Sequence, residues 1–418
     1  MDNAQEKQQQ QPNATRRSSV SSEDSVSVDG AVTGEFTDRS GDDAAAVVQL
    51  GFAEQVEEDE RDEAFGHEAF PSKIGGRPTW LNPTKPLPAE RVLCGVCKDP
   101  MTFLLQLYAP EDQPAEAFHR TIYMYCCPKG ACHQASWRDC FRVLRSQLPR
   151  DNPDDEEEEE EDDAPIWQLS CTPGVVCAVC GLHGSKQCSR CRGVFYCSRT
   201  HQILDWTVGG HREACGKASI LPEMAASMAA RRDRCLFAER EIVSEPEGEG
   251  EQAVRTDALE IPHRMAETYA KQDKEALEEE YEDTEVHVDD AFLAFQQRIA
   301  RYPDQVIRYA RVDYTKQPSR PLWVSDLGLP SMAEDITPCS YCGAERTFEF
   351  QVLPQMLNFL RIDHAATDAL DWGTLVVYTC TRNCHVPDES YMDELVWRQE
   401  FSRDGLQDRI APSPAAAS

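Results

Sequence analysis

The chain has 418 residues, enough for two or three domains, and a hydrophobic content of 40% can fill a core. Its 42 Lys and Arg residues are outnumbered by 74 Asp and Glu residues, and the net charge of -32 would repel a phosphate backbone but attract basic proteins. No apolar signal region and no membrane-spanning apolar run is found, so secretion and insertion into a bilayer are not expected. In a reducing compartment, the 18 cysteines are expected to bind metal or to lie buried as thiols.

Three folded parts are expected, separated by polar stretches. The amino-terminal residues are rich in Gln, Ser and Asp without a hydrophobic period, which is typical of a disordered tail. An unbroken acidic run from Asp154 to Asp163 must stay solvated and predicts a linker. Phe292, Phe295 and Ile299 recur at helical spacing and predict an amphipathic helix. The expected folded parts are 46–150, 166–217 and 290–408, and the expected tails and linkers are 1–45, 151–165, 218–289 and 409–418, with some helix near Met224 to Phe237.

The first and last folded parts resemble each other. The stretch from Cys94 to Leu107 aligns without a gap on Cys339 to Val352, and each begins with a Cys-x-x-Cys knuckle that leads into a strand. Downstream, Thr121 to Cys127 matches Thr374 to Cys380, and a further cysteine follows in both copies. The predicted fold is therefore α+β and β-rich: a bipartite, duplicated zinc-bearing β unit with a separate Cys-rich insertion.

The alignment also selects the metal ligands of the two outer units. Cys126 pairs with Thr379, whereas Cys127 pairs with Cys380, so Cys127 is the better ligand. His133 and His385 follow the last cysteine of each set and could substitute as ligands, and the cysteines could also be small buried core residues. One zinc per copy is predicted, on Cys94, Cys97, Cys127 and Cys132 in the first and on Cys339, Cys342, Cys380 and Cys384 in the second.

Between the two copies lies a short segment with eight ligands of zinc type. They are Cys177, Cys180, Cys188, Cys191, Cys197, His201, His211 and Cys215. A segment this short buries little core, so structural zinc, worth about 10 to 16 kcal/mol in finger peptides, is expected to hold it together.

This spacing, with the Phe195-Tyr196-Cys197 run and the Asp205-Trp206 pair, resembles the MYND finger. In that family the ligand pairs interleave. The resemblance therefore implies one zinc on Cys177, Cys180, Cys197 and His201, and a second on Cys188, Cys191, His211 and Cys215. His201 stands where many MYND fingers have cysteine, and a neutral imidazole is an acceptable zinc ligand.

Outside the amino-terminal tail, the acidic run and residues 218–290, nearly all of the chain resembles the programmed cell death protein 2 family. The resemblance includes Phe70 to Leu81, Phe103 to Pro110, Phe118 to Arg120 and Phe348 to Gln355, together with the finger. It implies a cytosolic, partly nuclear protein that acts as a dedicated chaperone for a newly made protein of the small ribosomal subunit. The predicted partner is therefore a basic ribosomal protein, and neither a membrane nor a nucleic acid is expected as a direct partner.

Two other function classes are considered. A SET-type methyltransferase would need a cofactor-binding Asn-His pair and a post-SET cysteine segment, and the sequence contains neither, so no enzyme is predicted. Gly75-Gly76 is interpreted as a tight turn and not as a phosphate cradle. The alternative function is a transcriptional adaptor whose finger binds proline-containing corepressor peptides, but it would not explain the outer zinc units.

Overall fold

The computed structural model describes residues 48–150, 174–248, 289–311 and 320–401, except Ala365 and Thr367. The predicted tails, the acidic linker 151–165 and Cys171 lie outside the described residues. None of the described helices is long and apolar enough to cross a membrane.

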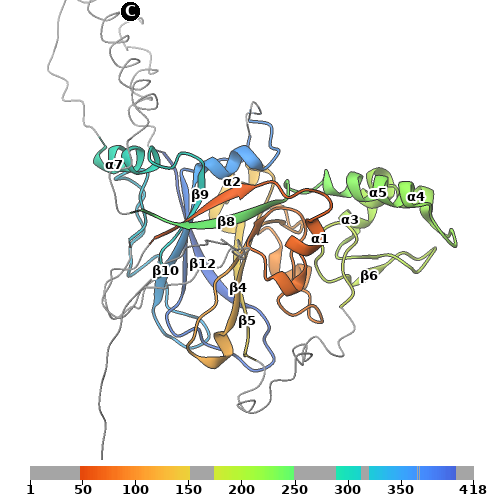
Figure 1. Ribbon diagram of the computed structural model, residues 1–418, viewed down its shortest axis with the longest axis horizontal. Helices are drawn as coiled ribbons and strands as arrows, with labels where there is room; N and C mark the ends of the chain where they lie inside the picture. Colours follow the sequence, from red (N-terminus) through yellow and green to blue (C-terminus); the bar gives the residue numbers. More distant parts are fainter. Residues whose placement is uncertain are drawn as a thin grey trace, which may run out of the picture. The chain divides into compact units, whose positions relative to one another are not determined.

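Within the described residues, ten strands form one closed antiparallel barrel, in the order β1-β8-β2-β3-β4-β5-β12-β11-β10-β9 (Figure 1). Hydrogen bonds between β1 and β9 close it. The strands are β1 (Gln49–Glu54), β2 (Lys73–Ile74), β3 (Thr102–Tyr108), β4 (His119–Cys126), β5 (Phe141–Leu148), β8 (Arg240–Pro246), β9 (Gln305–Tyr309), β10 (Arg346–Val352), β11 (Thr374–Cys380) and β12 (Met392–Gln399). A separate hairpin consists of β6 (Lys186–Gln187) and β7 (Phe195–Tyr196).

Short helices connect these strands. The α-helices are α1 (Arg61–Ala64), α2 (Gly130–Ser136), α3 (Arg199–Leu204), α4 (His211–Ala214), α5 (Pro222–Asp233) and α7 (Asp290–Ile299), and the 3-10 or π turns are η1 (His67–Ala69), η2 (Ala89–Val92), η3 (Ala115–Ala117), η4 (Trp137–Asp139), η5 (Asp205–Gly209) and η6 (Pro354–Phe359). Helix α7 confirms the amphipathic prediction. Phe295 and Ile299 are buried, and the Asp289 side chain caps the helix by accepting a hydrogen bond from the Phe292 backbone N–H.

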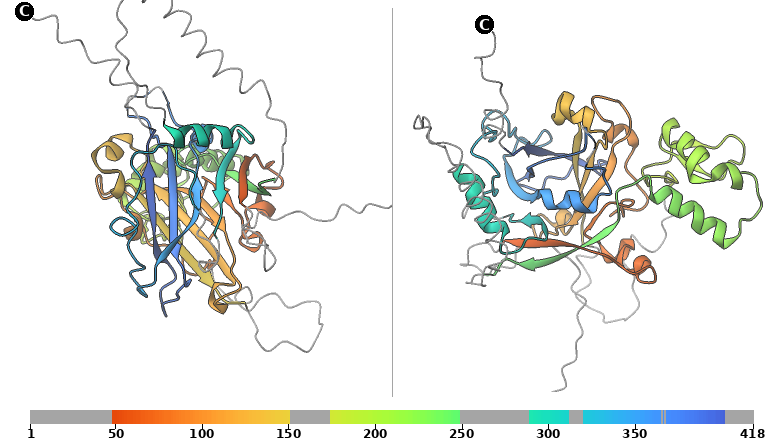
Figure 2. Two further views of the ribbon diagram at one scale, coloured as in Figure 1. Left: turned by 90° about the vertical axis from the view of Figure 1, so that its left-hand side faces the viewer. Right: turned by 90° about the horizontal axis from the view of Figure 1, so that it is seen from above.

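The two outer segments meet in one sheet. Strand β5 of the first segment pairs with β12 of the last, with Met392 opposite Arg145, so the barrel joins residues that are far apart in sequence (Figure 2). The β-rich fold class is confirmed in this form, as a single closed barrel.

The strands β3-β4-β5 pair with one another in the same register as the strands β10-β11-β12 do, so that equivalent residues lie opposite each other in both sets. Phe103 lies opposite Tyr125, and Phe348 lies opposite Tyr378. The pairing register then shifts in both β3 and β10, between Phe103 and Leu105 and between Phe348 and Phe350. These positions are the ones that the sequence alignment pairs.

The helix expected near Met224 to Phe237 forms as α5. The prediction of a largely disordered linker over 218–289 is wrong for residues 240–246, which form β8 and pair with β1 and β2 inside the barrel. The acidic composition obscured the strand, because Ile242 is its one fully buried side chain and its other positions are partly or fully exposed. Residues 249–288 lie outside the described residues.

The glycine pair after β2 confirms the predicted turn. Gly75 and Gly76 have φ angles of 62° and 65°, in the left-handed region that glycine adopts without strain. A Cβ atom on Gly75 would lie 2.2 Å from the Ala238 carbonyl oxygen. The turn therefore lets the chain that leads into β8 pack directly against β2.

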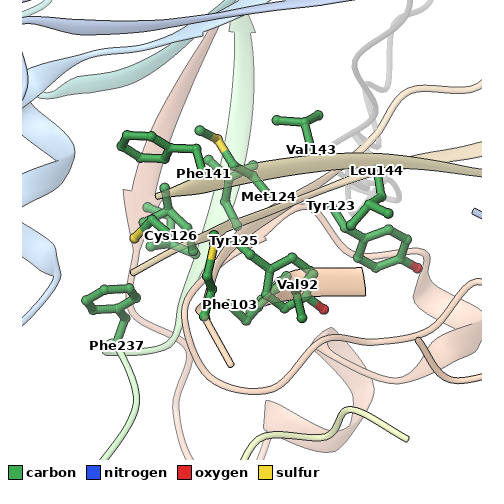
Figure 3. Close-up of a cluster of buried hydrophobic side chains, with 14 of the residues drawn as sticks. Val92, Phe103, Tyr123, Met124, Tyr125, Cys126, Phe141, Val143, Leu144 and Phe237 are labelled. Carbon is green, nitrogen blue, oxygen red and sulfur yellow. The ribbon is translucent and has the colours of Figure 1, made fainter. Parts of the chain in front are cut away.

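The main core includes a group of aromatic side chains and extends across segment boundaries. Phe103, Tyr125 and Phe141 lie together from three neighbouring strands, and Phe237, from the stretch before β8, is close to them (Figure 3). The same buried cluster includes the finger residues Cys180 and Tyr196. The barrel and the insertion therefore share one hydrophobic core.

Buried ion pairs connect the two outer segments inside the barrel. The Arg120 guanidinium donates to both Glu349 carboxylate oxygens, at 2.6 and 2.7 Å, and Arg311 donates to the same carboxylate at 2.8 Å. Arg145 donates to Glu394 at 2.7 Å, and both of these side chains are fully buried. Burial raises the pKa of Glu349, but the charges of Arg120 and Arg311 outweigh it and hold the pKa far below its usual value.

Candidate metal centres

The structure brings all sixteen predicted ligands together as four groups of four. Within each group the donor atoms lie within 4.8 Å of one another. The groups are Cys94, Cys97, Cys127 and Cys132; Cys177, Cys180, Cys197 and His201; Cys188, Cys191, His211 and Cys215; and Cys339, Cys342, Cys380 and Cys384. Each group has the membership that the sequence predicted.

All four groups begin with the same backbone turn. The residue after the second cysteine is Lys98, Gly181, Arg192 or Gly343, with φ between 55° and 77°. In each case its N–H donates to the carbonyl of the first cysteine, at 2.9 to 3.0 Å. This turn directs both thiols of a Cys-x-x-Cys pair to one side. Lys98 and Arg192 adopt it although non-glycine residues rarely have positive φ.

The distances between donors fit a tetrahedral zinc ion. Two sulfurs bound at about 2.3 Å lie roughly 3.8 Å apart across a tetrahedron. One sulfur–sulfur distance between the first and second ligand pairs of each group is 3.9 Å for Cys97 to Cys127, 3.5 Å for Cys180 to Cys197, 3.9 Å for Cys188 to Cys215 and 3.5 Å for Cys342 to Cys380. Four thiolate or imidazole donors per group is the set found in structural zinc sites.

In the outer groups, a strand end supplies the third ligand. Cys127 directly follows β4, and Cys380 ends β11. The fourth ligand comes from the next turn of the chain, Cys132 in α2 and Cys384 beyond β11. The fold of the barrel strands therefore brings the third and fourth cysteines of each outer group next to its Cys-x-x-Cys pair.

In the central groups, a short helix supplies one ligand of each second pair, His201 in α3 and His211 in α4. His201 lies four residues after Cys197, and its Nδ1 is 3.2 Å from the Cys197 sulfur. Ser198 caps α3 by accepting the His201 N–H at 3.1 Å, which fixes the start of the helix. His211 and Cys215 are also four residues apart, and the His211 Nε2 is 3.6 Å from the Cys191 sulfur. Cys197 precedes the N-cap Ser198 of α3, and Cys215 directly follows α4, so each pair combines a helical ligand with one just outside the helix.

Crowding of the thiols separates their pKa values. Burial raises the pKa of Cys94, but N–H groups of Cys97 and Val96 outweigh it and lower that pKa to about 7. The same balance, with the Cys191 N–H and the His211 ring as donors, lowers the pKa of Cys188 to about 6. Neighbouring thiols instead become harder to ionise, and burial raises the pKa of Cys215 to about 11. A divalent cation would remove this mutual repulsion and favour the thiolate form throughout.

The remaining described cysteines and histidines stay outside the groups. Cys126 is fully buried, and Cys235 is half-buried in the turn that follows α5. Cys140 is buried 3.9 Å from the Cys94 sulfur without joining the group. His133 is buried, with its Nε2 2.7 Å from the Cys127 carbonyl oxygen, so it supports the site without ligating. His385 is exposed.

Two supporting contacts were not anticipated from the sequence. Asp205 is fully buried and accepts hydrogen bonds from Arg232 of α5, at 2.7 and 2.9 Å, and from the Tyr196 hydroxyl at 2.8 Å. The Trp80 indole N–H donates to the Gly181 carbonyl at 3.0 Å, which joins the barrel to a central knuckle. Both contacts join residues that are distant in sequence, and the spacing of residues along the chain does not predict such contacts.

Family models match three parts of this chain. Residues 47–162 match the N-terminal domain of programmed cell death protein 2, residues 289–400 match its C-terminal domain, and residues 177–215 match the MYND finger. The chain belongs to the programmed cell death protein 2 family. The matched finger spans all eight central ligands.

Similar proteins cover most of the chain. It is 37% identical to programmed cell death protein 2 of Bos taurus over 86% of this chain and 98% of that protein. The identity to the Rattus norvegicus protein is also 37%, over 85% of this chain and 97% of that one. Programmed cell death protein 2-like of Homo sapiens is 26% identical, over 79% of this chain and 90% of that protein. No solved structure matches the chain.

Proposed function

We propose that this family member is a dedicated chaperone of a newly made, basic protein of the small ribosomal subunit, acting in the cytosol and partly in the nucleus. A free ribosomal protein is basic, and its charge and apolar surface must be masked until it joins the subunit. The observation that carries the proposal is the charge of -32, because an acidic protein attracts such a client at long range.

The described surface includes a concentrated acidic patch. We call the exposed residues Glu54, Glu57, Glu58, Asp59, Glu60, Asp62 and Glu63 the β1–α1 patch. Burial, followed by the charges of Glu54 and Glu60, raises the pKa of the neighbouring Glu241. The seven carboxylates of the patch make the local potential negative, which supports binding of a cationic segment.

We propose a structural role for zinc, with one ion in each of the four groups. Every group already offers four protein donors, which leaves no open position for a substrate or an activated water. This closed ligation supports a binding function over a catalytic one. Elemental analysis of the purified protein should give four zinc ions per chain, and a value of two would remove the outer sites.

We also infer that the barrel contains two copies of one zinc-bearing unit. The support is the common register of β3-β4-β5 and β10-β11-β12, their irregularities at matching positions, and one four-cysteine group per meander. Client capture is assigned to this barrel, with a subsidiary role for the finger. Removing Cys94 or Cys339 should therefore weaken client binding more than removing Cys188.

Depletion of the protein from cells tests the function most directly. Newly made small-subunit ribosomal proteins should then aggregate or be degraded, and small subunits should decline. If all of these proteins stay soluble and small subunits remain at their normal level, the chaperone proposal fails.

Charge reversal tests the contribution of the β1–α1 patch. The double variant Glu57→Lys, Glu58→Lys should slow association with the ribosomal protein and reduce the salt dependence of that rate. The double variant Asp112→Lys, Glu116→Lys makes the same change of charge at other exposed positions. Equal effects of both variants would show that only the net charge matters and not the patch.

A cavity beside the finger favours a second candidate, the adaptor function. Its volume is about 320 Å³, and its lining includes Gln202, Ile203 and Trp206 next to the Cys188 group. Ile203 is 52% exposed and offers an apolar contact to a peptide. Binding of proline-containing corepressor peptides by the finger, without recovery of ribosomal proteins by the barrel, would favour this function.

A further inference from the structure

A cavity lined by arginines lies between α7, β9 and the chain before β10. Its volume is about 440 Å³, in the range of ligand pockets. Arg298, Arg301, Arg308 and Arg320 line it together with Gln297 and Gln351, and its apolar wall includes Phe348 and Leu322. We call this the arginine pocket. No acidic side chain of the described residues lines it, which is unusual in a chain of net charge -32.

Part of the positive charge is already compensated. Arg308 donates to both carboxylate oxygens of Glu247, at 2.9 and 2.8 Å, and Arg298 donates to the same carboxylate. Two guanidinium groups therefore share one carboxylate, and the trio keeps a net positive charge. Glu247 is buried, so this charge is fixed in place by the fold.

Within the described residues, the other two arginines have no carboxylate partner. Arg301 and Arg320 are exposed, and neither guanidinium has a hydrogen bond or ion pair with any other side chain that the structure describes. Guanidinium groups bind carboxylates and phosphates through paired N–H donors. These two groups are thus available to an anionic ligand.

Hydrogen bonds hold the wall of the pocket at Leu322, two residues after Arg320. The Gln351 side chain accepts the Leu322 N–H at 2.6 Å and donates to the Leu322 carbonyl at 3.0 Å. The Arg308 guanidinium also donates a hydrogen bond to the side-chain oxygen of Gln305, at 2.9 Å. A pocket that is already formed loses little entropy when it binds a ligand.

We propose that the arginine pocket binds an acidic peptide segment of a partner protein, with an anionic side chain on Arg301 and Arg320 and a neighbouring apolar side chain against Phe348. A long phosphate backbone would have to cross a surface that is acidic overall, so a nucleic acid fits poorly. A compact acidic segment avoids that repulsion. This partner differs in charge from the basic client, so the pocket does not depend on the proposed chaperone function.

Fluorescence anisotropy on the full chain tests the pocket. The probe is a labelled decapeptide of alternating glutamate and leucine, and a second probe carries phosphoserine in place of two glutamates. The double variant Arg301→Glu, Arg320→Glu should weaken binding of both probes by about tenfold or more. The double variant Arg212→Glu, Arg234→Glu makes the same change of charge at exposed arginines elsewhere and should bind as the wild type does.

Three outcomes would overturn the proposal. The first is equal loss of binding in both double variants, which would indicate general electrostatics. The second is complete displacement of the peptide by millimolar inorganic phosphate, which would indicate a small-anion site only. The third is binding that appears only after residues 249–288 are deleted, which would mean that the chain's own acidic segment occupies the pocket.

Discussion

At the scale of single residues, neighbouring cysteines differ in role. Cys126 and Cys127 are adjacent and both buried, yet only Cys127 belongs to a metal group. Spacing alone could not separate them, and the internal alignment did so because Cys126 corresponds to a threonine. The supporting groups around the site were not predictable in this way, since Asp205 and Arg232 meet only after the chain has folded.

We predict that Cys127→Ser and Cys126→Ala have opposite effects on zinc content. Cys127→Ser removes one of four donors and should lower the zinc content by one ion per chain. Cys126→Ala should keep all ions and cost only about 1 kcal/mol of stability from lost packing. Elemental analysis of both purified variants measures this, and loss of zinc from Cys126→Ala would contradict the assignment.

Glu349 is predicted to be the most consequential single charge in the barrel. Glu349→Gln leaves Arg120 buried without a carboxylate and Arg311 with only Glu111, and it should lower the free energy of unfolding by about 3 to 5 kcal/mol at neutral pH. The exposed substitution Glu116→Gln should change it little. Denaturant unfolding of the two variants and the wild type gives the comparison.

The same carboxylate predicts an acid dependence. Because its pKa is depressed in the folded state, its contribution is complete above the usual value of 4.5 and is lost as the pH falls toward the folded pKa. The difference in stability between wild type and Glu349→Gln should therefore narrow as the pH falls below about 4.5. A constant difference across the acidic range would argue against this ion network.

At the scale of elements, strands were predictable where their sequence is apolar. Strands β3, β4, β10 and β11 are almost entirely buried and were expected from the repeated pattern. Strand β8 was missed because only Ile242 is buried among charged and polar neighbours. Its place is fixed by hydrogen bonds to β1 and β2, and such long-range pairing leaves no pattern in a short acidic stretch.

We predict that β8 is essential to the barrel although its composition is that of a linker. Ile242 is fully buried, and its N–H donates to the Ser72 carbonyl at 2.8 Å. Ile242→Ala should lower the free energy of unfolding by about 2 to 4 kcal/mol. Glu245→Ala, at the exposed end of the same strand, should be close to neutral. Equal, small effects in thermal unfolding would mean that β8 contributes little.

At the scale of the whole molecule, the finger is part of the barrel's architecture. The expectation of an insertion on flexible acidic linkers does not describe its contacts, because the Cys180 knuckle lies in the same buried cluster as Phe103 and Tyr125. Trp80 bonds to Gly181, and the His183 N–H donates to the Leu87 carbonyl at 2.9 Å. After the finger, α5 leads directly to β8.

Loss of the zinc group at Cys180 is therefore predicted to destabilise the barrel as well as the finger. Cys180→Ser should increase hydrogen exchange at the amides of β3, because the knuckle packs on the loop that precedes this strand. Cys191→Ser is the matched control. It removes a ligand from the other central group, whose knuckle forms no hydrogen bond to that loop among the described residues, and it should affect β3 less. If β3 exchanges equally slowly in the wild type and in Cys180→Ser, the finger folds independently and its shared core with the barrel has no energetic consequence.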